Sequence, residues 1–384
     1  MIPDYDGGSI VNLMASISQA LGGVPRHPPL RFLANAELHA ARNIVLFIID
    51  GLGERQLRER IPQGNLAAAH RAVMTSVFPP TTASAITTTY TGATPLEHGL
   101  TGWHTYFSGA ACVAATLPMR SRGDDAALSA RGLSASAAFA ECSLFDSLAA
   151  PTVVVTDRRI IDSVYNRFHC GKARRIPYRT IEELVDCTVA SVREDGPRKL
   201  VYTYWPEFDS AAHRFGPGSS EAGARASQAD AAYGLLRDRL RGTDSMLIAT
   251  ADHGFLDTPP ERALSIEDAA GLAALLRLPL CGERRSAFCH VQRGRESEFM
   301  ARAKDWLGER ATVRPSQELV DEGWFGPGRA HPSFAERIGD VALLMHGDHT
   351  VKDWVAGEPR FVLRGNHGGT SPEEMQIPLA VVYC

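Results

Sequence analysis

Hydrophobic residues along this chain gather in short, unbroken runs. Such runs occur at 43–50 (NIVLFIID), 152–156, 200–205 (LVYTYW), 246–252 (MLIATAD) and 377–383. Continuous apolar runs that are rich in β-branched residues are typical of central strands in a parallel sheet covered on both faces. We therefore expect each run to form a buried strand.

Segments that suit helices lie between these runs, chiefly at 82–90, 181–193 and 221–241. A chain in which strands and helices alternate is typical of an α/β fold. The pattern predicts a mostly parallel central sheet that is flanked by helices.

The pattern changes after residue 254, where Gly- and Pro-rich joints separate a different set of elements. We expect two helices and two strands there, at 265–276 and 296–307 and at 287–292 and 340–346. We interpret residues 255–360 as an inserted α+β cap, and residues 1–254 with 361–384 as the catalytic core. The segment 104–133 has few periodic signals, and we expect a long loop near the site.

Composition narrows the class of protein. The chain has 384 residues, of which 44% are hydrophobic and 22% charged, so it can bury a sizeable core. A net charge of −4 and the lack of a Lys/Arg run argue against binding to a nucleic-acid duplex. No apolar run approaches the ~18–20 residues of a membrane helix, so no membrane association is expected.

The seven cysteines are scattered and include no CxxC pair. An odd, unpatterned set favours reduced thiols over a disulfide framework. The first residues also lack a basic segment followed by an apolar one, as a secretory signal would have. We expect a cytoplasmic protein, or a periplasmic one if the chain is a processed form. The sequence does not indicate an oligomeric state.

Residues that commonly bind metals follow four presumed strands, namely the runs at 43–50, 200–205 and 246–252 and the segment FVLRGN at 361–366. In a parallel sheet the carboxyl ends of the strands meet in one crevice, so these side chains are expected to converge. Two of them lie four residues apart and would face the same way on a helical turn. The set is Asp50, Asp209, His213, Asp252, His253 and His367.

Three aspartates and three histidines form a mixed oxygen and nitrogen ligand set. Such a set suits Zn²⁺, with Mn²⁺ as the alternative. Three protein ligands for each of two ions would leave both ions open for catalysis. Taken singly, an aspartate at a strand end is more often a turn former or a helix cap. The six together predict a centre for two divalent metal ions.

A candidate nucleophile lies in the segment FPPTTASAITTTYTG, where two prolines precede Thr81 and Thr82 and Gly92 can end a helix. Either threonine would lie at the helix N-terminus, where free N–H groups favour a phosphate. A hydroxyl bound there to a divalent ion can attack phosphorus. The alternative is an ordinary threonine N-cap.

The ordered motifs LFIIDG, FPPTTASAITTTYTGATPLEHGL, WPEFDSAAHRFGPGSSEA, ATADHGF and GNHGG resemble a known family. They are similar to the nucleotide pyrophosphatase/phosphodiesterase branch of the alkaline phosphatase superfamily. The pattern D-x-x-x-H-x-x-G-P at 209–217 is particularly characteristic of that branch. The family's nucleophilic threonine lies nine residues before the threonine of a TG pair, and counting back from Thr91 selects Thr82.

The resemblance implies a division of the ligands between two zinc ions. Asp209, His213 and His367 would hold one ion; Asp50, Asp252, His253 and the Thr82 oxygen would hold the other. It also implies attack by Thr82 on phosphorus, a covalent phospho-threonine intermediate, and then hydrolysis. The implied substrate is a small-molecule phosphate diester or phosphoanhydride, with a nucleotide as one candidate.

One position departs from the family pattern. The family usually has an asparagine twenty-one residues after the nucleophile, and here that position is Trp103. His104, or the backbone N–H after Thr82, is a candidate substitute donor to phosphate. Trp103 itself would either contact the substrate or be an ordinary core tryptophan.

Two further groups carry weaker signals. The run HGDH, with His346, Asp348 and His349, would either bind a third ion or form a solvated turn. The pair Arg284-Arg285, or Arg364, would contact a second phosphate of a substrate or lie on the surface.

Other functions are open at this point. A phosphomonoesterase and a phosphonate hydrolase of the same superfamily are the enzyme alternatives. A sulfatase would need a C/S-x-P-x-R motif, which FPPTTA does not supply. A non-catalytic metal-binding scaffold is a further alternative, but retention of all six ligands together with Thr82 argues against it.

Overall fold

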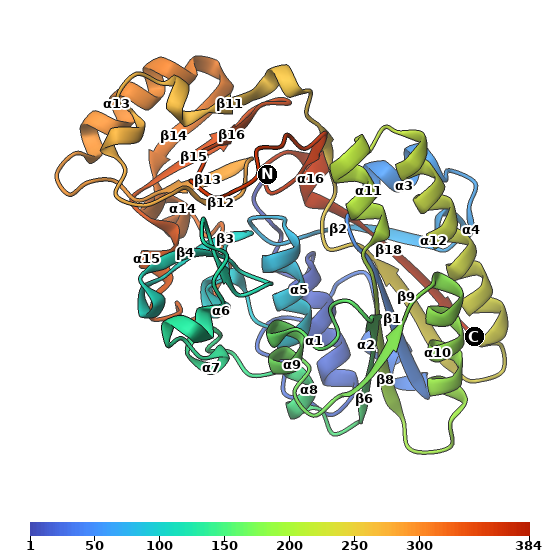
Figure 1. Cartoon of the computed structure of the whole chain (residues 1–384). Helices are drawn as coiled ribbons and strands as arrows, with labels where there is room; N and C mark the ends of the chain where they lie inside the picture. Colours follow the sequence, from blue (N-terminus) through green and yellow to red (C-terminus); the bar gives the residue numbers. More distant parts are fainter.

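The computed structural model describes all residues, 1–384, and has two lobes, each built around a seven-stranded sheet (Figure 1). The sheet of the larger lobe has the strand order β2-β18-β9-β1-β8-β6-β7. In chain order its strands are β1 (Asn43–Ile49), β2 (His70–Thr75), β6 (Thr152–Asp157), β7 (Arg174–Tyr178), β8 (Lys199–Trp205), β9 (Ser245–Thr250) and β18 (Gln376–Tyr383). Only β18 runs against the others, so the predicted mostly parallel sheet is confirmed.

All five strands predicted from apolar runs are present, whereas β2 and β7 were not predicted. These two are the edge strands of the sheet, with sequences HRAVMT and RRIPY and several partly exposed residues. An edge strand is covered less completely than a central one, so its sequence is more polar and lacks a continuous apolar run.

Successive side chains of β1 enter two different cores, one on each face of the sheet. Leu46 belongs to the first core and its neighbour Phe47 to the second. This follows from the two-residue period of a strand. Helices cover both faces: α1 (Ile10–Ala20) and α5 (Thr82–Thr91) pack on the first core, α10 (Ile181–Arg193) and α12 (Ser220–Arg239) on the second (Figure 1).

The smaller lobe contains the second sheet, with the order β14-β15-β13-β12-β3-β4-β5. Its strands are β3 (His104–Phe107), β4 (Cys112–Ala115), β5 (Arg120–Ser121), β12 (Cys281–Gly282), β13 (Ser286–Cys289), β14 (Ala311–Pro315) and β15 (Val341–Met345). The two strands expected near 287–292 and 340–346 are confirmed as β13 and β15. Helix α13 (Glu296–Leu307) is also confirmed and covers one face of this sheet.

The segment 104–133 is not the long loop that we expected. Its strands β3 and β4 form a hairpin that joins the second sheet through the pairing of His104 with Gly282. That pairing joins residues separated by almost half of the chain, so no local pattern could predict it. The predicted domain division at 254/255 and 360/361 stays a prediction, but the smaller lobe also includes β3, β4 and β5.

The helix expected at 265–276 was wrong. The segment instead forms two short 3₁₀ turns, Ile266–Asp268 and Ala273–Leu275. Between them Gly271 adopts a left-handed φ of 71°, which interrupts a right-handed helix.

The second face of the smaller sheet packs on a loop and the short helix α16 (Pro372–Met375) of the larger lobe. Phe288 and Leu344 from the sheet share a core with Phe78 and Met375. The smaller lobe is thereby held against the region that follows the strands of the larger one. None of the helices combines the length and the hydropathy that a membrane crossing requires.

The remaining elements are short. The helices are α2 (Asn35–Ala40), α3 (Glu54–Arg60), α4 (Asn65–Ala68), α6 (Pro95–His98), α7 (Ala135–Ala138), α8 (Leu144–Ser147), α9 (Val164–His169), α11 (Glu207–Phe215), α14 (Ser316–Asp321), α15 (Phe334–Ile338) and α16 (Pro372–Met375). The strands are β10 (Leu256–Asp257), β11 (Ala263–Ser265), β16 (Thr350–Lys352) and β17 (Gly365–Asn366).

Candidate metal centre and its cavity

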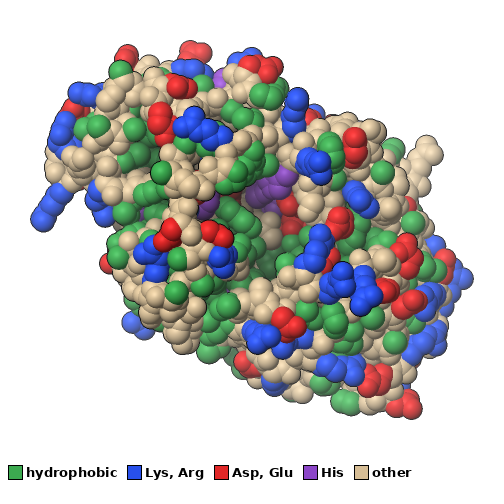
Figure 2. Space-filling view, in the orientation of Figure 1, with side chains coloured by type: hydrophobic (Ala, Val, Ile, Leu, Met, Phe, Trp, Pro, Cys, Tyr) green, Lys and Arg blue, Asp and Glu red, His purple; other side chains and the backbone are tan.

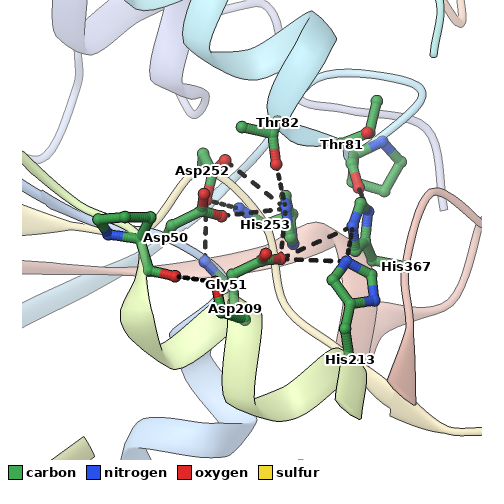
Figure 3. Close-up of polar contacts among 12 residues, drawn as sticks. Asp50, Gly51, Thr81, Thr82, Asp209, His213, Asp252, His253 and His367 are labelled. Carbon is green, nitrogen blue, oxygen red and sulfur yellow. Dashed lines mark hydrogen bonds and ion pairs between the residues drawn. The ribbon is translucent and has the colours of Figure 1, made fainter. Parts of the chain in front are cut away.

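The structure brings all six predicted ligands together at the carboxyl ends of adjacent parallel strands (Figure 3). Asp50 follows β1, Asp252 and His253 follow β9, and α11, which carries Asp209 and His213, follows β8. His367 comes from the loop after β17. Because β9, β1 and β8 are neighbours, three strands that are spread over about two hundred residues of sequence end at the same edge.

Close backbone packing requires glycine beside two of these ligands. Gly51 has a left-handed φ of 75°, and a Cβ atom there would lie 2.4 Å from the Phe255 ring. A Cβ atom on Gly254 would lie 2.0 Å from a backbone oxygen of Glu373. Larger residues at these positions would push the ligand-bearing loops apart.

The ligand atoms form two groups of three. Oxygens of Asp50 and Asp252 and a ring nitrogen of His253 lie within 4.8 Å of one another, and so do ligand atoms of Asp209, His253 and His367. His213 also belongs with the second group, because its Nε2 lies 3.3 Å from Asp209 Oδ1 and 3.2 Å from His367 Nε2. His253 thus lies between the two groups.

Backbone carbonyls fix the tautomer of all three histidines. The Nδ1 atoms of His213, His253 and His367 donate to backbone oxygens at 2.9, 3.1 and 3.2 Å. In each neutral ring the proton is therefore on Nδ1, and the lone pair of Nε2 points into the cluster. This outer hydrogen bond is the usual arrangement behind a metal-binding histidine.

Three carboxylate oxygens in the cluster are buried and accept no hydrogen bond: Asp50 Oδ1, Asp209 Oδ1 and Asp252 Oδ2. They face His253 Nε2 at distances of 3.4, 3.9 and 3.6 Å respectively. Buried carboxylate oxygens without a donor are costly, and a cation is what would compensate them. The residues therefore fit divalent metal ions.

Mutual repulsion is visible in the pKa values of the cluster. Burial, and then the charges of Asp209 and Asp252, raise the pKa of Asp50 well above its usual value. Burial, followed by the proximity of His253 and His213, lowers the pKa of His367 well below its usual value. Both shifts disfavour charged forms in the absence of a compensating ion.

Thr82 lies directly beside the cluster, as predicted. It is the first residue of α5, after the N-cap residue Thr81, and the helix ends at Gly92 in the left-handed conformation. Thr82 Oγ1 lies 3.2 Å from His253 Nε2 (Figure 3). Thr81 instead donates to Glu283 at 2.6 Å, so its hydroxyl is turned away from the ligands.

A cavity of about 440 Å³ extends from the ligands toward the smaller lobe. Histidines are visible in the hollow between the lobes (Figure 2). We call one part of its wall the core end, formed by Thr81, Thr82, Asp209, His213 and His367. We call the other part the cap end, formed by Trp103, His104, Arg122, Arg284, Lys352 and Phe361.

The two residues predicted as substrate contacts, Trp103 and His104, both line this cavity. Trp103 is 40% exposed and is therefore not a core tryptophan. Burial, and then the nearby charges of Arg122, Lys352 and Arg284, lower the pKa of His104 well below its usual value, so the ring is neutral at pH 7. Their contact with a substrate stays a prediction.

The structure decides between the alternatives for the weaker groups. His346 bonds Thr312 and a backbone oxygen of Glu309, and the HGDH run lies outside both groups of ligand atoms. Arg285 is buried and pairs with Glu374. Arg364 is exposed and is not part of the cavity wall, whereas Arg284 is.

Two residues that support the site were not predicted. Tyr204 donates a short hydrogen bond to Asp50 Oδ2 and so orients that carboxylate. Glu283 accepts hydrogen bonds from Thr81 Oγ1 and from the backbone of Trp103, both at 2.6 Å. Tyr204 lies within an apolar strand pattern and Glu283 within a cap segment, so neither stood out in the sequence.

Comparison with known protein families decides to which family this chain is related. The family described as type I phosphodiesterase/nucleotide pyrophosphatase matches residues 44–369. The chain belongs to this family. The resemblance inferred from the motifs, and the placement in the alkaline phosphatase superfamily, are thereby confirmed.

Solved structures share the fold of this nucleotide pyrophosphatase family member. Murine ectonucleotide pyrophosphatase/phosphodiesterase 5 is 17% identical, with 88% of this chain and 87% of that chain covered and a TM-score of 0.66. The human counterpart is 18% identical, with the same coverage and TM-score. Phosphonoacetate hydrolase from Sinorhizobium meliloti 1021 is 17% identical, with 89% and 90% covered and a TM-score of 0.62. No curated protein sequence matches the chain significantly.

Proposed function

We propose that this protein is a two-metal phosphodiesterase that hydrolyses small phosphate diesters or phosphoanhydrides with Thr82 as the nucleophile. One observation carries the proposal. Three carboxylate oxygens without donors and three histidine nitrogens with free lone pairs converge beside a threonine hydroxyl at a helix N-terminus. Membership of the family supports diester or anhydride chemistry over monoester hydrolysis.

Two divalent ions are the proposed cofactors, and the mixed nitrogen and oxygen donors favour zinc over manganese. Asp209, His213 and His367 would hold one ion; Asp50, Asp252 and His253, with Thr82, would hold the other. When bound, such ions lower the pKa of a hydroxyl or water and offset charge on phosphoryl oxygens.

The chain's own residues position the reaction. Thr82 Oγ1 releases its proton to solvent and attacks phosphorus, its bond to phosphorus forms, and the bond to the leaving oxygen breaks with its electron pair kept by that oxygen. The free backbone N–H groups at the start of α5 face the resulting charge on the phosphoryl group. Water then attacks the phospho-threonine, the threonine oxygen leaves, and the hydroxyl of Thr82 is restored.

The cavity supports a small-molecule substrate. Its volume of about 440 Å³ lies in the range of small-ligand sites, and residues of both lobes line it. An inactive variant of the murine relative was solved in complex with AMP, which makes a nucleotide one candidate. Phosphonoacetate hydrolase shares the fold, so hydrolysis of a phosphonate is the competing candidate activity.

A direct comparison of substrates tests the proposal. Purified protein is analysed for metal content and assayed with zinc on bis(4-nitrophenyl) phosphate, 4-nitrophenyl phosphate and phosphonoacetate. We expect about two zinc ions per chain, loss of activity with a chelator, and the highest kcat/KM for the diester. A preference for the monoester or for phosphonoacetate would move the protein to the corresponding alternative class.

A further inference from the structure

Three cations lie at the cap end of the cavity, where the proposed chemistry does not need them. Arg122 comes from the segment after β5, Arg284 from the turn between β12 and β13, and Lys352 from β16. A backbone hydrogen bond of 2.8 Å from Val351 to the oxygen of Arg284 holds two of these segments side by side.

Arg122 already has partners for its charge. It donates to both oxygens of Glu358 and to Oδ1 of Asp353, each at 2.8 Å. The other oxygen of Asp353 accepts the backbone N–H of Leu280 at 2.8 Å. All four carboxylate oxygens therefore already accept a hydrogen bond, and both carboxylates form their ion pairs with Arg122 rather than with Arg284 or Lys352.

Arg284 has no such partner. Its guanidinium forms no hydrogen bond or ion pair with the protein and lies 5.2 Å from the centre of the Phe361 ring. Burial, which outweighs the attraction of Glu283, lowers the pKa of Arg284 to about 10. A largely desolvated guanidinium without a counter-ion is costly, and its five N–H groups suit a carboxylate or phosphate.

Lys352 is in the same situation. Its Nζ atom lies 3.7 Å from the centre of the Trp354 ring and 4.8 Å from that of Phe361, and no carboxylate pairs with it. Burial, followed by repulsion from Arg284, lowers the pKa of Lys352 to about 8. Both cations thus contact the face of Phe361 and repel each other, and an anion bound near them would relieve this repulsion.

We propose that Arg284 and Lys352 bind a second anionic group of the substrate, a carboxylate or a phosphate, while its reacting phosphoryl group lies at Thr82. The inference rests on the proposed function, because it takes the core end of the same cavity as the place of reaction. It narrows the substrate class to phosphate diesters or anhydrides with a negative charge on the group that reaches the cap end.

Matched substrates and variants test the inference. The zinc-loaded enzyme is assayed on 4-nitrophenyl phenyl phosphate and on two analogues with a carboxylate or a phosphate on the phenyl ring. We expect the wild type to favour at least one charged analogue. Arg284→Met and Lys352→Met should each raise KM for that analogue by about 10–100-fold, as expected for loss of a charged hydrogen bond. The unsubstituted diester should change by less than about 3-fold, since it has no second anionic group to accept that bond.

Two controls separate binding from folding. Arg293→Met removes an exposed charge of the smaller lobe outside the cavity wall and should leave all three substrates unchanged. Arg284→Lys keeps the charge and should retain part of the preference. Thermal unfolding is measured for each variant, and if Arg284→Met does not fold, Lys352→Met decides.

Each outcome has a distinct meaning. A preference for the carboxylate analogue alone, or for the phosphate analogue alone, supports the inference and identifies the anion. Equal turnover of all three diesters by the wild type, or an equal loss on all three in the variants, overturns it and leaves the proposed function standing. If the zinc-loaded wild type cleaves no diester, the proposed function fails, and this inference fails with it.

Discussion

The two ends of the cavity differ in almost every physical respect. The core end adjoins the ligand cluster, which is acidic and rich in histidine, and most of whose residues follow strands of one parallel sheet. The cap end is cationic and aromatic, and its residues come from turns and short strands of the smaller lobe. At the core end carboxylates lack cations; at the cap end Arg284 and Lys352 lack anions.

This difference indicates that catalysis and substrate recognition depend on different parts of the molecule. Groups that act on phosphorus need fixed geometry, which the adjacent strands β9, β1 and β8 supply. Groups that recognise the rest of a substrate can vary with the lobe that carries them, because function lies in sites that are added to a common fold. We therefore propose that bond cleavage takes place at the core end and that selectivity is set at the cap end.

The largest expected effect is that of replacing Thr82, and its absence would contradict the contrast between the two ends of the cavity. Thr82→Ala should lower kcat by at least about 10³-fold on every substrate, because the nucleophile is lost. Metal content should not change, since the six Asp and His ligands stay. Thr82→Ser is the matched control and should keep substantial turnover. An active alanine variant would show that cleavage does not depend on this hydroxyl.

Asp50→Asn should change stability in opposite directions with and without metal. Without metal, the substitution removes a buried carboxylate that is repelled by Asp209 and Asp252, so the melting temperature should rise by about 2–4 °C. With zinc present it should fall, and kcat/KM should drop by about 100-fold, because a ligand is lost. Calorimetry with chelator and with zinc measures both. A fall in both conditions would argue against the cation-binding role of this cluster.

The pH dependence of selectivity sharpens the contrast at the cap end. Burial, followed by the charge of Arg284, lowers the pKa of Lys352 to about 8, whereas Glu358 and Asp353 act in the opposite direction. Lys352 is therefore charged below about pH 8 and neutral above it. The preference for a diester with a second anionic group over the unsubstituted diester should fall about 10-fold as pH rises through this value. The step should be absent from Lys352→Met, and a persistent step would assign it to another group.

The smallest expected effect concerns Trp103. Its side chain lines the cavity and is 40% exposed, so Trp103→Ala should leave folding intact. We expect KM to rise by about 3–10-fold for aryl diesters through loss of ring contact, with kcat nearly unchanged. Trp103→Phe should recover most of that loss. A fall in kcat instead would place Trp103 among the groups that position the phosphoryl group.

By itself the sequence determined the parallel frame and the order of the ligands along it. The runs around β1, β8 and β9 are fully buried on both faces, so their apolar character and the polar residues after them were visible locally. Edge strand β2 could not be recognised in the sequence, because its partly exposed residues break the apolar run. The 3₁₀ turns near Gly271 could not be recognised either, because they depend on the left-handed φ of that glycine.

Only the tertiary structure decided which residues meet at the cap end. His104 pairs with Gly282, and Arg284 lies beside Lys352, through contacts between segments that no local period connects. Whether an arginine is paired also depends on these contacts: Arg285 meets Glu374, whereas its neighbour Arg284 faces the cavity alone. Ligands at the ends of parallel strands follow from chain order, but the partners of an arginine in the smaller lobe follow from packing.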